Sequence, residues 1–302
     1  MTAVTTAVTV EKTQEEPRTS VAKRTLTSPW ASVVAIIIAI LWTTPTFGLF
    51  VTSFRQPADI LKNGWWNTLT NPTFTLENYR EVLTGGETRL VDYFLNSIII
   101  TIPAVIIPVT IASLAAYAFA WTKFRGRDAL FVGVFTLQVV PLQVALIPLL
   151  SLFVAQESLR GTFWSVWIAH SAFALPFAIF LLHNFMKEIP EELVEAARMD
   201  GANHARIFFQ VLMPLIKPAI AAFAIFQFLW VWNDLLVALT FLGGDLERAP
   251  VTVRVAELAG SRGQAWYLLS AGAFVMIAVP VTVFLLAQRY FVRGLLAGGL
   301  KG

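Results

Sequence analysis

Residues 195–218 read EAARMDGANHARIFFQVLMPLIKP, a stretch of acids, bases, a glycine and two prolines that lies between two strongly apolar segments. The chain around it has 302 residues, of which 57% are hydrophobic and only 14% are charged. That composition leaves too little polar surface to cover a water-soluble globule of this size. We therefore predict a membrane protein in which this stretch is a loop outside the bilayer.

The number of spans follows from the thickness of the bilayer. A hydrocarbon core of about 30 Å requires roughly 20 mostly apolar residues in a helix. Six segments meet this requirement, near 31–53, 94–120, 130–154, 163–185, 219–242 and 269–291. We predict an all-α, polytopic membrane protein with a polar, disordered tail over 1–29 and a transmembrane domain over 30–302. The tail is too long and too polar to be the basic region of a cleavable signal.

The distribution of basic residues orients these spans. Fourteen of the 22 Lys and Arg residues fall on one side if the N-terminus, the 121–129 loop, the 186–218 loop and the C-terminus share that side. Because basic residues are enriched in cytoplasmic loops, we expect both termini and the quoted stretch to face the cytoplasm.

The quoted loop carries signals for two short helices. Pro190 suits the first turn of a helix, and Glu191 and Glu192 follow where the helix dipole favours acids. Gly201 can adopt the left-handed conformation that ends a helix, and Asn203 can cap a second helix. The first helix is expected to present a narrow face of small and apolar side chains, formed by Leu193, Ala196 and Ala197. The second helix is expected to present an apolar face formed by Ile207, Phe208, Val211 and Leu212.

Such an elbow could be a docking surface for another protein or an amphipathic connector resting on lipid headgroups. Its mixture of five acids and four bases between 187 and 217 is a poor match to anionic lipid. On physical grounds alone the two interpretations are about equal.

The order of residues in this loop resembles the EAA loop of the membrane-spanning subunits of ABC importers. That pattern is Glu-Ala-Ala, three residues, Gly, nine residues, Ile, one residue and Leu-Pro. Val211 and Met213 replace the family's Ile and Leu, and both remain apolar. The residues in register are Glu195, Ala196, Ala197, Gly201 and Pro214.

Other segments extend the resemblance over roughly residues 30 to 302. They are similar to the carbohydrate, maltose-type branch of these permeases: FLNSIIIT (94–101), PLQVALIPL (141–149), PFAIFLLHNF (176–185), WNDLLVALTFL (232–242) and QRYFVRGLLAGGLKG (288–302). The resemblance implies the type I importer permease fold, with six spans and the EAA loop at about 186–218, in the cell membrane of a prokaryote. It also implies that the terminal residues near Lys301 can reach between ATPase subunits.

The resemblance further implies an importer built from several proteins. The expected partners are a homologous second permease subunit, a pair of ATPase subunits that bind ATP and Mg, and an extracytoplasmic sugar-binding protein. The cargo is expected to be a disaccharide or short oligosaccharide, with glycerol 3-phosphate or another small solute as the alternative. The sequence has no G-x-x-x-x-G-K-[ST] stretch, so we expect a transport subunit that holds no cofactor and is not an enzyme.

Residue roles in coupling come from the same resemblance. The helix around 195–201 is expected to sit in a cleft of one ATPase subunit, where Glu195 makes a charge contact and Ala196 and Ala197 allow close packing. A Gly201→Asp change is expected to uncouple transport by forcing a side chain into a left-handed, packed position. Asp200, Ala202 and Pro214 complete the expected coupling residues.

A path for the sugar is harder to place. Asp234 is the only acid well inside a predicted span, and Asn233, Trp230 and Gln227 lie near it along the helix. A sugar could use these aromatic and hydrogen-bonding groups. The alternative is that the polar groups hold helices together through hydrogen bonds, a role that we slightly favour for Asp234 because a neutral sugar needs no charge.

Two other classes of membrane protein fit less well. An ion-coupled transporter predicts carboxylates on facing helices and two related halves, and a membrane-embedded enzyme predicts a nucleophile with a base or a metal. The sequence offers one acid in a span and no second half. It has no cysteine, and His183 and His204 lack partners at metal-ligand spacing, so we assign no metal. No basic cluster with interleaved aromatics suggests nucleic acid.

Overall fold

The structure is a computed structural model that describes residues 29–85, 89–258 and 265–299, with side chains described as far as 288. Within these ranges the chain is helical, and its extended pairing is limited to one bridge between Arg55 and Phe74. The all-α prediction is therefore confirmed. The chain divides into two units, Met1–Val51 and Thr52–Gly302. Helix α2 (Pro29–Ser53) supplies the described part of the first unit and is long and apolar enough to cross a membrane.

The second unit is built around four long helical stretches. These are α5 (Leu90–Trp121), α8 (Phe163–Lys187), the continuous stretch His204–Trp232, and α14 (Trp266–Gly299), and each has the length and apolar composition of a membrane span. With α2, the described residues contain five such helices, or six if one bent pair is counted as a span. The predicted number of six spans thus depends on that pair.

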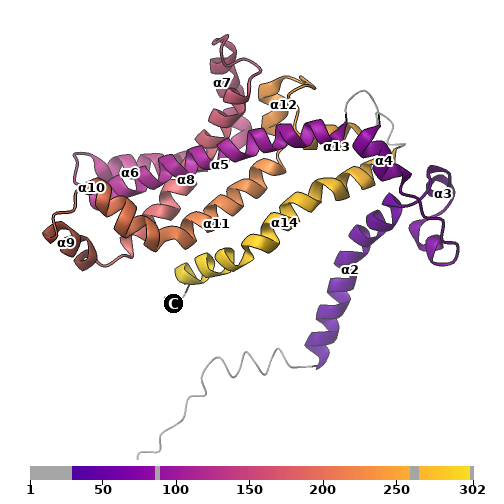
Figure 1. Ribbon diagram of the computed structural model, residues 1–302, viewed down its shortest axis with the longest axis horizontal. Helices are drawn as coiled ribbons and strands as arrows, with labels where there is room; N and C mark the ends of the chain where they lie inside the picture. The colour runs from indigo at the N-terminus through magenta and orange to yellow at the C-terminus, as the bar shows by residue number, and fades with distance from the viewer. Residues whose placement is uncertain (1–28, 86–88, 259–264, 300–302) are drawn as a thin grey trace, which may run out of the picture. The chain divides into compact units, whose positions relative to one another are not determined.

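The bent pair replaces the straight span expected over 130–154. Helix α6 (Arg127–Thr136) continues into the 3₁₀ turn η2 (Leu137–Val139), and α7 (Leu142–Val154) then leaves at an angle of 105°. Val140 and Pro141 are extended at the junction, with ψ of 119° and 133°. A proline disfavours the helical conformation of the residue before it, which explains the break. Figure 1 shows α7 standing out from the direction of α5 and α6.

The fifth span also differs from the expected range of 219–242. The helix begins earlier, as α10 (His204–Arg206) and the π-helical η3 (Ile207–Leu212), and continues as α11 (Met213–Trp232). After Trp232 the chain breaks and restarts as α12 (Leu236–Leu242), followed by α13 (Val251–Leu258). A single helix over 219–242 is therefore wrong, because the chain is interrupted at Asn233 and Asp234.

Helices α5 and α8 form the most extensive helix pair of the second unit. Their buried faces repeat every four residues and are rich in small side chains, which lets the two backbones approach closely. In lipid, where burial of apolar groups gives little drive for association, such close packing is what holds helices together. The repeating buried residues are Ala104, Pro108, Ala112, Ala116 and Ala120 on α5, and Val166, His170, Ala174, Ala178, Leu182 and Met186 on α8.

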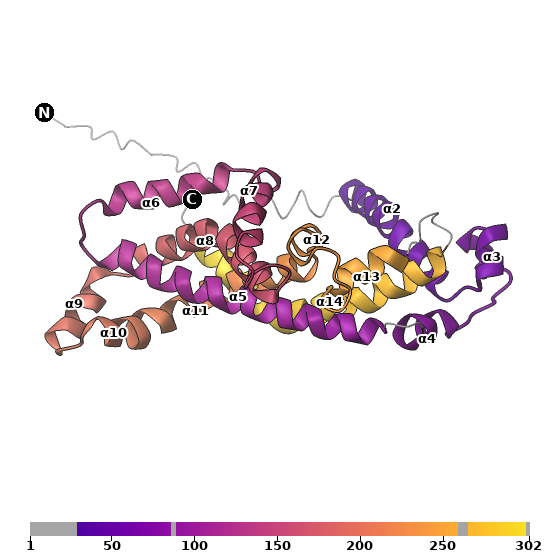
Figure 2. The same cartoon turned by 90° about the horizontal axis from the view of Figure 1, so that it is seen from above.

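The two ends of α5 have different neighbours. At one end lie α9 (Glu191–Met199) and α10, and at the other lie α13 and α4 (Glu77–Thr84) (Figure 1, Figure 2). Helix α4 follows α3 (Pro57–Lys62) and η1 (Trp65–Leu69) and packs on α14 through the buried Val82. The hydroxyl of Thr75 accepts a hydrogen bond from the N–H of Glu77 at the start of α4 (3.1 Å).

Candidate functional site

The quoted loop folds into an elbow, which we define as residues 190–213. Its first arm is α9, which begins directly after the extended Pro190. Val194 is only 1% exposed and packs into the cluster formed by α5, α8 and η3, with Ala197 beside it. The other side of the arm is open, since Leu193 is half-exposed and Met199 is 87% exposed. One face of α9 is thus anchored to the bundle while the other is free of contacts within the described chain.

A glycine turn ends this arm. Gly201 has φ of +77°, and the N–H groups of Gly201 and Ala202 donate to the carbonyls of Arg198 and Ala197, both at 2.9 Å. This pair of bonds is the Schellman arrangement, which favours glycine at the left-handed position. A Cβ atom at Gly201 would meet no other atom within 4 Å. The left-handed prediction is confirmed, but no residue that the structure describes packs against the position, so within that part of the chain only the backbone disfavours a side chain there.

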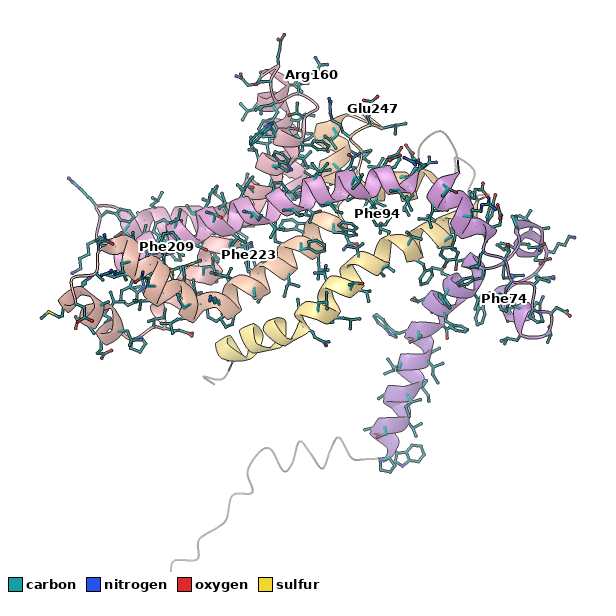
Figure 3. The ribbon with its side chains drawn as sticks, viewed as in Figure 1. Phe74, Phe94, Arg160, Phe209, Phe223 and Glu247 are labelled. Atoms are coloured by element: carbon teal, nitrogen blue, oxygen red, sulfur yellow. The ribbon has the colours of Figure 1, made fainter. Side chains whose placement is uncertain are left out.

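The second arm starts with a side-chain cap and continues as a π-helix. The Asn203 side chain accepts a hydrogen bond from the N–H of Arg206 at 2.9 Å, as predicted. Ile207 and Phe208 are buried in the same cluster as Val194, whereas Phe209 is exposed (Figure 3).

The π-helix has an identifiable cause. Pro214 has no N–H to donate, and in an α-helix its ring would clash with the carbonyl four residues earlier. The π-helical η3 ends at Leu212, two residues before this proline, with the N–H of Met213 bonded to the carbonyl of Phe208. Such one-turn widening is a known way to accommodate a local conflict and is frequent at functional sites.

Most of the residues expected to couple to an ATPase lie on the open side of the elbow. Glu195, Ala196, Asp200 and Gly201 are exposed, and Pro214 lies exposed at the start of α11. Ala197 and Ala202 are half-buried and pack against the cluster that contains Val194. Neither Glu195 nor Asp200 forms an ion pair with any residue that the structure describes. Their charges are therefore available to a partner.

Sequence reasoning missed the residue that anchors α9. The predicted face of Leu193, Ala196 and Ala197 is mostly exposed, and Val194 makes the buried contact instead. Val194 and Ala197 are three residues apart and so share a face of the helix. The available signal was the β-branched apolar side chain of Val194, three residues before Ala197.

An apolar cleft of about 1140 Å³ lies where the bent pair α6–η2–α7 faces α8 and α11. None of its described lining residues is charged, and the polar ones are few, with Gln138 the longest of them. Aromatic side chains from two helices form much of the wall: Phe173 and Phe177 on α8, and Phe226 and Trp230 on α11.

Of the four residues considered for the sugar path, the structure places Trp230 in the wall of this cleft. Gln227 is completely buried and donates from Nε2 to the carbonyl of Ala104 on α5 at 3.2 Å. Asn233 donates from Nδ2 to the carbonyl of Leu229 at 2.7 Å, on its own helix. These two side chains connect backbone groups rather than line the cleft.

Asp234 caps the helix that follows it. Its two carboxylate oxygens accept hydrogen bonds from the N–H groups of Val237 (3.3 Å) and Ala238 (3.0 Å), which belong to the first turn of α12. His170, 1% exposed on α8, approaches the same carboxylate at 3.7 Å from its Nε2. Neither ring nitrogen of His170 has a hydrogen-bond partner among the described residues. Asp234 therefore satisfies backbone groups exposed by the break after Trp232.

Among the described residues, no group of three or more His, Cys, Asp and Glu side chains is arranged to hold a metal ion. Lys301 and the end of the C-terminal tail lie outside the described residues.

Comparison with known proteins identifies the family to which the chain belongs. Residues 108–296 match the family described as binding-protein-dependent transport system inner membrane component. The osmoprotective compounds uptake permease protein GgtD of Synechocystis sp. is 52% identical over 273 residues, which are 89% of this chain and 91% of that protein. The alpha-glucoside transport system permease protein AglG of Rhizobium meliloti is 49% identical over 79% of this chain and 63% of that protein.

A solved structure agrees with the fold. A chain of a bacterial ABC transporter involved in the import of the acidic polysaccharide alginate superposes with a TM-score of 0.69. The alignment covers 92% of this chain and 100% of that chain at 21% sequence identity. This likeness concerns the arrangement of helices.

Proposed function

Because the chain belongs to the family of inner membrane components of binding-protein-dependent transport systems, we propose that it is a permease subunit of an ATP-driven importer for sugars. In this role it lines part of the path through the membrane and catalyses no reaction itself. The observation that carries the proposal is the elbow, in which one face of α9 is anchored by Val194 while the other presents unpaired charge and apolar side chains.

The open face of α9 suits contact with an ATPase subunit. The chain has no phosphate-binding loop, so the energy of ATP must enter from another protein. In our proposal Glu195 pairs with a basic group of the ATPase, Ala196 allows its backbone to approach, and Gly201 fixes the turn. Closure of the ATPase pair then moves the elbow, and the buried contacts of Val194 and Phe208 carry that movement into the bundle as a rigid-body shift.

The cargo that fits best is an α-glucoside of about disaccharide size. Aromatic walls with few polar groups are typical of sites for neutral ligands, and the cleft beside Trp230 has such walls. The relative AglG is an alpha-glucoside permease by its name, which supports the same class of cargo. Glycerol 3-phosphate would favour basic side chains, and the described cleft has none. An ion-coupled mechanism is disfavoured because Asp234 already caps α12.

The proposed assembly also includes a homologous second permease and an extracytoplasmic binding protein that delivers the sugar. A solved bacterial alginate transporter holds a periplasmic protein loaded with an alginate pentasaccharide, which supports this kind of partner. With both termini and the elbow on the cytoplasmic side, the elbow would face the ATPase, whereas the cleft would receive the sugar that the binding protein delivers.

Reconstitution of the permease pair with its ATPase and binding protein in lipid vesicles tests the proposal. We expect ATP hydrolysis to rise when the binding protein carries an α-glucoside such as maltose or trehalose. We expect uptake to require ATP on the side of the vesicle membrane to which the elbow is exposed. An Ala196→Trp variant should abolish both responses, because the indole would prevent close approach of the ATPase. Glu157→Gln, at an exposed glutamate outside the elbow, is the control and should leave both responses unchanged. Uptake by this chain without any ATPase would overturn the proposal.

A further inference from the structure

A polar contact joins the elbow to α5, a span that does not adjoin it in sequence. The hydroxyl of Tyr117 on α5 and Nδ1 of His204 share a hydrogen bond of 2.6 Å. The Tyr117 ring also meets two aromatic rings of the second arm edge-on, with centroid distances of 6.0 Å to His204 and 5.4 Å to Phe208. Tyr117 is 8% exposed, whereas His204 is exposed, so this contact is partly shielded.

The neighbouring contacts between α5 and the elbow are apolar. Ala116 and Ala120 belong with Ile207 and Phe208 to one hydrophobic cluster. Apolar contacts between smooth surfaces are non-directional and allow one helix to slide over another. A hydrogen bond is directional, so the Tyr117–His204 pair fixes the position of the second arm along α5.

The local fold of the elbow holds His204 in place for this contact. The Asn203 side chain caps the turn that begins at His204, and the Gly201 turn sets the direction of the chain just before it. Gly201, which belongs to the EAA pattern, and Asn203, which does not, therefore together position His204.

We propose that Tyr117 and His204 form a latch that makes α5 move together with the elbow. Movement of the elbow reaches α8 and α11 through the chain itself, because α9 follows α8 and η3 continues into α11. Helix α5 does not adjoin the elbow in sequence and contacts its cluster through apolar packing, to which the latch adds a directional contact. Tyr117 is thus a positioning residue for coupling, and this inference rests on the proposed function of the elbow.

The chain offers a matched pair of variants for a test. Tyr117→Phe removes the hydroxyl and keeps the ring. Tyr93→Phe makes the same change on the same helix, at a fully buried tyrosine whose hydroxyl has no hydrogen-bond partner among the described residues. We expect Tyr117→Phe to lower the amount of sugar transported per ATP hydrolysed about three- to tenfold, because that factor corresponds to the loss of one hydrogen bond. We expect Tyr93→Phe to leave that ratio unchanged.

A double substitution separates the latch from a general weakening of the fold. If the two side chains act as one unit, Tyr117→Phe with His204→Ala should lower the transport ratio no further than either change alone. Multiplied losses would show that the two residues act independently and would overturn the latch.

A distance measurement tests the latch without any ATPase. The sequence has no cysteine, so Leu114→Cys on α5 and Gln210→Cys on the second arm, both exposed, can carry a pair of spin labels. The latch predicts a narrow distance distribution in the parent chain and a broader one after Tyr117→Phe. Equal widths would overturn the latch, whereas ATP-independent uptake with a broadened distribution would contradict only the proposed function.

Discussion

Two of the breaks between the described helices use their polar groups in opposite ways. At the elbow, Glu195 and Asp200 are exposed and form no ion pair with any described residue. At the break after Trp232, Asn233 and Asp234 both bond to backbone groups of the chain itself. The charges of the elbow are thus available to a partner, whereas the polar groups at the break after Trp232 are satisfied by backbone groups of the chain. This difference separates the residues that we propose couple to an ATPase from residues that hold the fold.

The largest effect should come from the anchor of the elbow. Val194→Asp places a carboxylate in an apolar cluster, and we expect it to destabilise the elbow by about 4 kcal/mol or more. Limited proteolysis between 187 and 213 should accelerate strongly. Leu193→Asp, at the half-exposed neighbour, is the control and should change stability by less than about 0.5 kcal/mol. Equal sensitivity of both variants would mean that α9 is not anchored through Val194.

Charge reversal on the open face should act on transport rather than on stability. We expect Glu195→Lys to lower ATP-dependent uptake about tenfold or more, because it sets like charges against each other at the ATPase contact. The melting temperature should stay close to that of the parent, since Glu195 has no ion-pair partner among the described residues. Glu157→Lys, at another exposed glutamate, is the control. A large fall in melting temperature would give Glu195 a structural role.

The capping role of Asp234 predicts a smaller and more selective effect. Asp234→Ala should cost about 1–2 kcal/mol of stability because α12 loses its cap. Asparagine caps helices about as well as aspartate, so Asp234→Asn should retain most of that stability and of uptake. If the asparagine variant lost uptake as completely as the alanine variant, the charge of Asp234 would matter for transport itself.

The smallest effect should come from Gln227. Its bond to the carbonyl of Ala104 crosses from α11 to α5, and such interhelical bonds in membranes contribute about 0.6 kcal/mol on average. Gln227→Leu should therefore leave the KM for sugar unchanged and lower stability slightly. Trp230→Ala, one turn away in the cleft wall, should raise the KM instead. The reverse pattern would place the sugar path at Gln227.

Local sequence signals predicted the elbow well. Pro190, Gly201 and Asn203 act through their own backbone or through residues two or three positions away, so their effects can be read without knowing the fold. The long spans were predicted for a similar reason, because membrane thickness sets a length that composition alone can meet.

The errors arose where composition hides a local conflict. Over 130–154 the sequence is apolar enough for one span, yet Pro141 disfavours a helical Val140 and the axis turns by 105°. Over 219–242 the average hydropathy masks Asn233 and Asp234, whose side chains end one helix and cap the next. The Tyr117–His204 contact joins residues 87 positions apart, which no local pattern contains.

One cross-linking measurement tests the role of the elbow most directly. Ala196→Cys is the only thiol in an otherwise cysteine-free chain, and it lies on the open face of α9. Our account predicts that a short bifunctional thiol reagent joins this position to an ATPase subunit in the assembled transporter, and that Gly244→Cys, in the loop after α12, gives no such product. Labelling of Ala196→Cys in intact cells by a membrane-impermeant thiol reagent, with no cross-link to the ATPase, would contradict it.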